Sequence, residues 1–147
     1  MSVFTFEDAV AAQTELMKRV NSVIRREIRR TCKNIIDDTP VDTGRLKNNW
    51  YASNRQVGVR TNKSTDPSGK NSLARVDKAL KRFKAGQRFS FFNNLPYARV
   101  VEFGLYPNPP KNPTGKTVNG FSRQAPSGML RKNVDGFARA MQKARIK

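Results

Sequence analysis

The chain has 147 residues, which suits a single domain, and its 29 Lys and Arg against 11 Asp and Glu give a formal net charge of +18, which points to an anionic partner. Histidine is absent, which excludes His-based acid/base catalysis, Ser-His and Cys-His nucleophiles and metal sites that need imidazole. No apolar run approaches the roughly 18 to 20 residues of a membrane span, and the N-terminus does not have the order of a secretory signal, so we expect no membrane association.

The first predicted element is a long helix over residues 6–36, a stretch without Pro or Gly. Thr5 is the predicted N-cap, and Glu7 and Asp8 suit the positive end of the helix. Cys32 lies among isoleucines, so we expect a buried apolar side chain rather than a reactive thiol. The spacing places one apolar arc of roughly 140° toward the core, made of Val10, Leu16, Met17, Val20, Val23, Ile24, Ile28 and Ile35.

A separate basic arc of roughly 140° lies on the other side of this helix. It has two interpretations: a solvated helix face, or a surface for an anionic partner. Because seven neighbouring cations repel one another, we favour the anionic partner, with any nucleic acid bound through its backbone and without base specificity. The members of this arc are Lys18, Arg19, Arg25, Arg26, Arg29, Arg30 and Lys33.

Short elements are predicted after Pro40, which ends the long helix. Asp42 is placed to cap a short helix over residues 43–49 that turns Leu46 inward. Residues 50–53 and 57–60 are predicted strands.

The middle of the chain alternates polar and amphipathic segments. Residues 61–71 are polar and aperiodic, which predicts a mobile loop or the tip of a hairpin. Residues 72–85 have the spacing of a second basic helix, residues 88–92 alternate as a strand, and residues 96–104 form a short helix closed by Gly.

Residues 104–128 carry five Pro and four Gly, a composition that predicts an extended arm outside the core. A last amphipathic helix is predicted over residues 127–146. The whole chain, residues 1–147, is therefore expected to be one α+β domain: the long N-terminal helix and the C-terminal helix pack on a small, mostly antiparallel sheet, with a long Pro/Gly-rich loop.

Three groups of residues invite a chemical interpretation. The segment PKNPTGKT at residues 110–117 ends like a phosphate-binding loop, but Pro110 stands where that loop needs Gly. Asp37, Asp38 and Asp42 lack the spacing of a calcium loop and are better explained as helix caps. Glu102 stands three residues from Arg99, which favours a structural ion pair over acid/base chemistry. We therefore expect no enzyme, no cofactor and no metal.

Three segments, taken in order, resemble the tail-component and neck proteins of tailed bacteriophages, a family that includes tail-completion proteins similar to the lambdoid minor tail protein Z. They are TPVDTGRLKNNW at residues 39–50, NNLPYARVVEFG at residues 93–104 and QAPSGMLRKNV at residues 124–134. The motif positions that carry the resemblance are Asp42, Thr43, Gly44, Leu46, Tyr97, Glu102 and Gly104.

The resemblance implies a non-enzymatic virion protein, made in the host cytoplasm, that forms a ring of six copies at the head-tail junction around the DNA channel. The implied partners are other copies of the chain, head-tail connector, tail terminator or tail tube proteins, and genomic DNA. In that setting Asp42 caps, Gly44 permits a tight turn, Tyr97 fills the core with its hydroxyl at the rim, and Glu102 pairs locally or across a subunit boundary.

The arm would reach a neighbouring subunit or the adjoining ring through Leu105, Tyr106 and Val118. Charge alone supports an alternative, a sequence-independent nucleic-acid-binding protein that acts through phosphate contacts.

Overall fold

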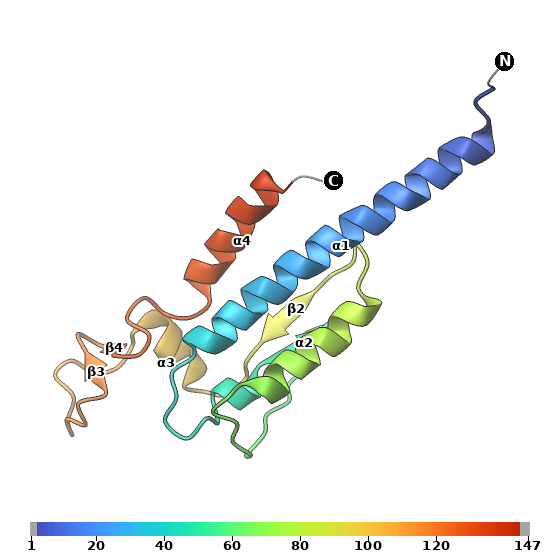
Figure 1. Cartoon of the computed structure of the whole chain (residues 1–147). Coiled ribbons are helices and arrows are strands. Elements are labelled where there is room, and N and C mark those ends of the chain that lie inside the picture. Colours follow the sequence, from blue (N-terminus) through green and yellow to red (C-terminus); the bar gives the residue numbers. More distant parts are fainter. Residues whose placement is uncertain (1–2, 145–147) are drawn as a thin grey trace.

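The computed structural model describes residues 3–144 and confirms the α+β class (Figure 1). Four helices and two small sheets make up this part of the chain. In chain order, the elements are α1 (Phe6–Asp38), the 3-10 helix η1 (Lys47–Asn49), β1 (Tyr51–Ser53), α2 (Lys70–Arg82), β2 (Ser90–Phe92), α3 (Ala98–Phe103), β3 (Thr117–Val118), β4 (Phe121–Ser122) and α4 (Arg131–Lys143).

Helix α1 begins at a capping box and ends just before Pro40. The Thr5 hydroxyl accepts a hydrogen bond from the Asp8 N–H at 3.2 Å, and the Asp8 carboxylate accepts one from the Thr5 N–H at 2.8 Å. This confirms the predicted N-cap. At the other end the helix runs through Asp38, past the predicted end at residue 36, until the Thr39 N–H bonds the Ile36 carbonyl.

The core lies where the C-terminal half of α1 passes between α2 and α4 (Figure 1). Cys32 is buried there, and desolvation raises the pKa of its thiol to about 12, in agreement with the predicted inert side chain. Trp50 stacks on Phe91 with ring centroids 4.7 Å apart, and its indole N–H donates to the buried Thr39 hydroxyl at 2.8 Å. The remaining buried apolar members are Ile35, Ile36, Leu46, Val76, Leu80, Phe83, Leu95, Ala98, Val101, Ala125 and Met129.

Both sheets are antiparallel and two-stranded. In the first, β1 pairs with β2 so that Ala52 lies opposite Phe91. In the second, β3 pairs with β4. The predicted strand over residues 57–60 is wrong: the Asn94 side-chain amide donates to the carbonyls of Gly58 and Arg60, at 2.8 and 3.0 Å, where a neighbouring strand would otherwise bond.

The segment at residues 61–71, predicted as a mobile loop or the tip of a hairpin, is held against η1 by specific hydrogen bonds. Its last two residues, Lys70 and Asn71, already belong to α2. The Asn62 N–H donates to Asn49 Oδ1 at 2.6 Å, and Asn48 Nδ2 donates to the Ser64 carbonyl at 3.1 Å. Asn48 and Asn49 are fully buried. Their side-chain amides bond to backbone groups that this aperiodic segment cannot pair within itself.

Residues 104–128 fold back on the domain instead of extending away from it. They contain the β3–β4 hairpin, and Ala125 is only 1% exposed. The expectation that this segment lies outside the core is therefore wrong for residues 120–128, whereas most of residues 107–119 are exposed as expected. Helix α4 starts at Arg131 rather than at residue 127, and the predicted end at residue 146 lies outside the described residues.

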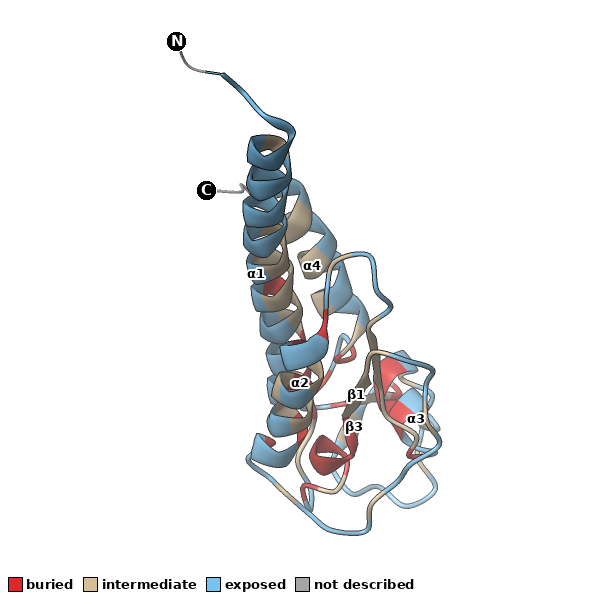
Figure 2. Cartoon of the chain, turned by 90° about the vertical axis from the view of Figure 1, so that its right-hand side faces the viewer, coloured by how far each residue is buried: buried red, intermediate tan, exposed pale blue. Residues whose placement is uncertain are grey.

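The N-terminal part of α1 projects beyond the rest of the domain, and its surface is exposed (Figures 1 and 2). The apolar arc is therefore only partly a core face. Ile35 is buried, but Val10, Leu16 and Met17 are 44%, 50% and 41% exposed, so the core-facing assignment is wrong for these three residues. None of the described helices is apolar over a length that could cross a bilayer.

Candidate functional site

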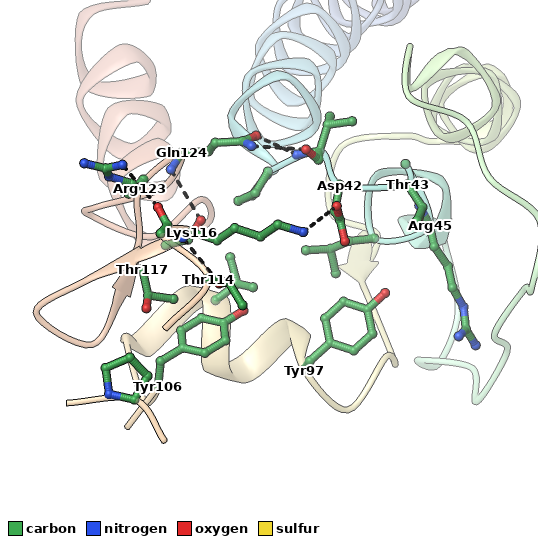
Figure 3. Close-up of a pocket in the computed structure, with 18 of the residues that line it drawn as sticks. Asp42, Thr43, Arg45, Tyr97, Tyr106, Thr114, Lys116, Thr117, Arg123 and Gln124 are labelled. Carbon is green, nitrogen blue, oxygen red and sulfur yellow. Dashed lines mark hydrogen bonds and ion pairs between the residues drawn. The ribbon is translucent and has the colours of Figure 1, made fainter. Parts of the chain in front are cut away.

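Residues of the segments 39–50 and 93–104 meet at one exposed cleft, here called the motif cleft, of about 590 Å³ (Figure 3). One wall is the loop before η1, which includes Asp42 and Thr43, and Tyr97 enters from the turn before α3. The other wall is the 104–128 segment. Five of the seven motif positions, Asp42, Thr43, Gly44, Leu46 and Tyr97, thus line this cleft, although the Leu46 side chain is mostly buried in the core.

Gly44 shapes the first wall because its backbone has φ +85°, a conformation that favours glycine. A Cβ at this position would lie 2.5 Å from the Pro67 backbone nitrogen. The Gly44 carbonyl also accepts hydrogen bonds from the N–H groups of Asn48 and Asp66, at 3.0 and 3.2 Å. The glycine therefore permits the tight turn that was expected of it, and joins three segments there.

The second wall is fastened to the first by exposed polar contacts (Figure 3). Lys116 Nζ lies 2.8 Å from Asp42 Oδ1. Gln124 bonds both backbone groups of Val41, accepting from the N–H at 2.7 Å and donating to the carbonyl at 3.1 Å. Asp42 therefore holds the arm through an ion pair, whereas η1 has no side-chain cap.

Two tyrosines line the cleft near these contacts. Tyr97 is 38% exposed, so it lies at the rim rather than in the core. Desolvation raises the pKa of both Tyr97 and Tyr106 above the ordinary value of 10.0. The cleft can thus offer phenol hydroxyls, aromatic surface and the cations of Arg45 and Arg123 to a bound segment.

The phosphate-loop-like sequence lies on this wall too. Lys116, its lysine, is engaged with Asp42, and a two-residue strand follows instead of a helix. The structure therefore lacks the helix N-terminus on which a phosphate-binding loop depends.

Glu102 is the most densely bonded motif residue. Its carboxylate accepts hydrogen bonds from the N–H groups of Met129, Leu130 and Arg131 at 2.8 to 3.0 Å, and from Arg131 Nε at 3.0 Å. Burial alone would raise its pKa, but these donors outweigh desolvation and hold the pKa below its ordinary value. Glu102 therefore anchors the start of α4, with Arg131 as its ion partner in place of Arg99, which lies over the Phe103 ring.

Gly104 closes α3 with φ +65° and is packed against the Phe121 ring, which a Cβ would approach to 2.3 Å. Of the three expected arm contacts, Leu105 and Val118 are 59% and 49% exposed, while Tyr106 is half-buried in the motif cleft.

The cations of the basic arc of α1 bond to several different groups within the chain. Arg25 donates to the Phe83 carbonyl and Arg29 pairs with Asp77 at 2.6 Å, so both face the α2 side. Elsewhere in the arc, Lys18 and Arg19 pair with Glu15, Arg26 and Arg30 pair with Glu27, and Lys33 pairs with Asp37.

A second hollow, here called the α1/α4 groove, has a volume of about 830 Å³. Its cations come from both helices and include two that were not among the predicted site residues, Arg139 and Lys143. In the sequence, these two residues stand four positions apart, so they lie one turn apart on the same face of α4. The sequence does not show that α4 packs on α1 and so places them beside the basic arc. The groove is lined by Arg19, Ser22, Val23, Arg26, Glu27, Arg30, Arg139, Ala140, Lys143 and Ala144.

The acidic residues considered as metal ligands are separated. Asp37 pairs with Lys33, Asp38 with Lys132 at 3.1 Å, and Asp42 with Lys116. Within residues 3–144, no three His, Cys, Asp or Glu side chains gather as a metal site would require.

Comparison with known proteins gives one family. The model of the family "Bacteriophage HK97-gp10, putative tail-component" matches residues 7–104, from the start of α1 to the glycine that ends α3. The third resembling segment, residues 124–134, lies outside the match. Searches of curated proteins and of solved structures returned no match. Because the match covers two thirds of the chain, the protein belongs to the HK97-gp10-like family of bacteriophage tail components.

Proposed function

We propose that the chain is a ring-forming subunit of the tail-completion or neck structure at the head-tail junction, with the genome passing through the ring. Family membership supplies the tail assignment. The observation that supports self-assembly is the α1 tip, defined as residues 3–17. In the tip, Phe4 and Phe6 are 79% and 80% exposed, and the side chains of Val10 and Met17 farther along the helix are exposed as well. Several large apolar side chains exposed along one side of a helix are typical of an interaction site.

The outer face of α2 is the proposed DNA-facing surface. Its cations Lys78, Lys81 and Arg82 are exposed, and none forms an ion pair with a described residue. Most of the basic arc of α1, by contrast, is already engaged with carboxylates. Free cations repeated around a ring would attract the phosphate backbone without reading bases.

The motif cleft and the arm are the proposed contact with an adjoining connector, terminator or tail-tube ring. Leu105 and Val118 supply exposed apolar side chains, and the fastening of the arm by Lys116 and Gln124 fixes their position. We assign the cleft no catalytic role because its carboxylate, Asp42, is paired with Lys116, while Glu102 holds the start of α4.

Native mass spectrometry and electron microscopy of the full chain test the proposal, alone and with the connector and tail-tube proteins of the same phage. We expect a closed ring of six copies. Phe6→Ser combined with Val10→Ser should abolish it, while Val57→Ser combined with Val59→Ser, a matched change at side chains 58% and 94% exposed elsewhere, should leave it intact.

A chain that stays monomeric with every partner would overturn the proposal. If that monomer also bound free duplex DNA tightly at physiological salt, the alternative of a sequence-independent nucleic-acid-binding protein would take its place.

A further inference from the structure

We infer that the α1 tip of one copy docks into the α1/α4 groove of a second copy. This contact deepens the proposed function, on which it rests, by naming the two surfaces that meet between neighbouring subunits. Both surfaces belong to the same chain but lie on different parts of it, so the contact is head-to-tail and can repeat around a ring.

Charge is the first argument for this occupant. The α1 tip contains Glu7, Asp8 and Glu15 and no Lys or Arg, because all 29 cationic residues of the chain lie from Lys18 onward. The tip is thus an acidic segment of a strongly basic protein. Any other copy of the chain offers it a basic surface, and long-range attraction favours that encounter.

The groove carries the complementary charge at its rim. Arg139 and Lys143 project from α4, and neither forms an ion pair with a residue of the described chain. Across the groove lie Arg19, Arg26 and Arg30 of α1. The groove therefore combines cations already paired within the chain on one side with cations free for a partner on the other.

Shape and polarity provide the second argument. Phe6, Val10 and Met17 fall on one side of the tip helix at helical spacing, and Glu7 and Glu15 lie beside and behind them. The groove likewise has small apolar side chains between its cations, namely Val23, Ala140 and Ala144. An apolar helix face with the Glu7 carboxylate at its side matches this lining.

The two surfaces also agree in length. From Phe6 to Met17 the tip helix rises about 17 Å, and the α1 side of the groove, from Arg19 to Arg30, rises about 17 Å as well, at about 1.5 Å per residue. The groove is therefore long enough to receive the whole exposed face of the tip.

DNA fits the groove less well than the tip does. The carboxylate of Glu27 lies in the lining, only 7% exposed, with Arg30 Nη2 2.6 Å from its Oε2 and Arg26 Nε 3.3 Å from its Oε1. A phosphate would meet that negative charge together with the apolar side chains, whereas the tip places its own apolar face there.

Two charge-changing variants of the full chain test the contact. The tip variant carries Glu7→Lys and Gln13→Lys, which leave the Glu15–Arg19 ion pair beside the groove intact, and the groove variant carries Arg139→Glu and Lys143→Glu. All four side chains are exposed, so the fold should survive, which circular dichroism checks. In sedimentation velocity we expect each variant alone to self-associate at least tenfold more weakly than the wild type.

Mixing the two variants in equal amounts gives the decisive result. An altered tip then meets an altered groove, and the wild-type tip of the groove variant meets the wild-type groove of the tip variant, so assembly should return. The matched control, Lys84→Glu with Arg88→Glu between α2 and β2, changes two exposed cations and makes the same change of charge as the groove variant, so it should assemble like the wild type.

The outcomes separate this inference from the proposed function. If the wild type forms rings and both variants do so equally well, or if the mixture fails to recover, the docking is wrong and the ring proposal stands. If the wild type never associates, the ring proposal itself fails. If only the groove variant changes, and what it loses is binding of duplex DNA, then DNA is the occupant of the groove and the docking is overturned.

Discussion

At the scale of single residues, Glu102 joins α3 to α4. One buried carboxylate satisfies three N–H groups at the start of α4, where a helix would otherwise leave its first donors unpaired. Because the three donors are consecutive, at residues 129–131, the loss of this one side chain removes the partner of all three N–H groups at once.

Glu102→Gln should lower the free energy of unfolding by about 1 to 3 kcal/mol at pH 7, since the amide keeps the shape but loses the charge-assisted bonds. The lowered pKa means that the stabilisation is complete above the ordinary value of 4.5 and is lost as the pH falls through the folded-state pKa. Urea unfolding at pH 7 and pH 3 should show the difference between variant and wild type shrinking at the lower pH.

The control for Glu102 is Asp135→Asn, an exposed carboxylate on α4 for which we expect a change within about 0.5 kcal/mol. A Glu102→Gln difference that stayed constant between the two pH values would show that the charge of the carboxylate does not contribute.

A comparison of Gly44 with Gly86 separates two contributions to the stability lost when glycine is replaced by alanine: the unfavourable backbone conformation and the steric clash of the added Cβ. Their φ angles are +85° and +87°, but a Cβ would meet Pro67 at Gly44 and nothing within 4 Å at Gly86. Gly86→Ala should cost about 1 kcal/mol, from conformation alone, and Gly44→Ala clearly more, measured by thermal unfolding. Equal losses would mean that the 61–69 segment moves aside freely.

At the scale of elements, α1 is one helix with two environments. Its C-terminal half carries Cys32, Ile35 and Ile36 in the core, while the tip has no neighbour within the described chain. Isolated helices of this length are marginal in water, so the tip depends on its capping box and on its continuity with the buried half.

The amide hydrogen-exchange rates of the two halves of α1 should therefore differ. In the monomer, the amides of residues 9–17 should exchange through local fraying, far faster than those of residues 28–36, which open only with the whole domain. On assembly, the protection of residues 9–17 should rise. Mass spectrometry of peptides from the two halves measures this, and uniform protection along α1 in the monomer would contradict it.

The sequence predicts local features of these elements well. Capping residues and an unbroken helical pattern define α1, and periodicity places α2 and β2. The segments predicted as a strand at residues 50–53 and as a short helix at residues 96–104 contain β1 and α3. Features that depend on distant partners are not predictable in this way. Val10 and Ile35 share one apolar arc, yet only Ile35 has a neighbour, and Glu102 pairs with Arg131 across a turn that spacing does not reveal.

At the scale of the whole molecule, the net charge of +18 is distributed unevenly. The α1 tip is acidic, most of the basic arc is paired with carboxylates, and the outer face of α2 carries free cations. We therefore propose a different partner for each surface: another copy for the tip and groove, an adjoining ring for the arm, and DNA for α2.

Duplex binding should accordingly depend on α2 and on salt, without sequence preference. Changing Lys78, Lys81 and Arg82 to Glu should weaken binding uniformly across sequences and reduce the slope of log affinity against log salt by about one for each phosphate that the variant no longer neutralises. Fluorescence anisotropy with two unrelated duplexes at several salt concentrations measures both effects. The groove variant with Arg139→Glu and Lys143→Glu is the comparison, because it removes two cations that we assign to subunit contacts. If it reduced the slope as much as the α2 variant, DNA would be held by the total charge of the protein, and the separate DNA-facing role of α2 would be wrong.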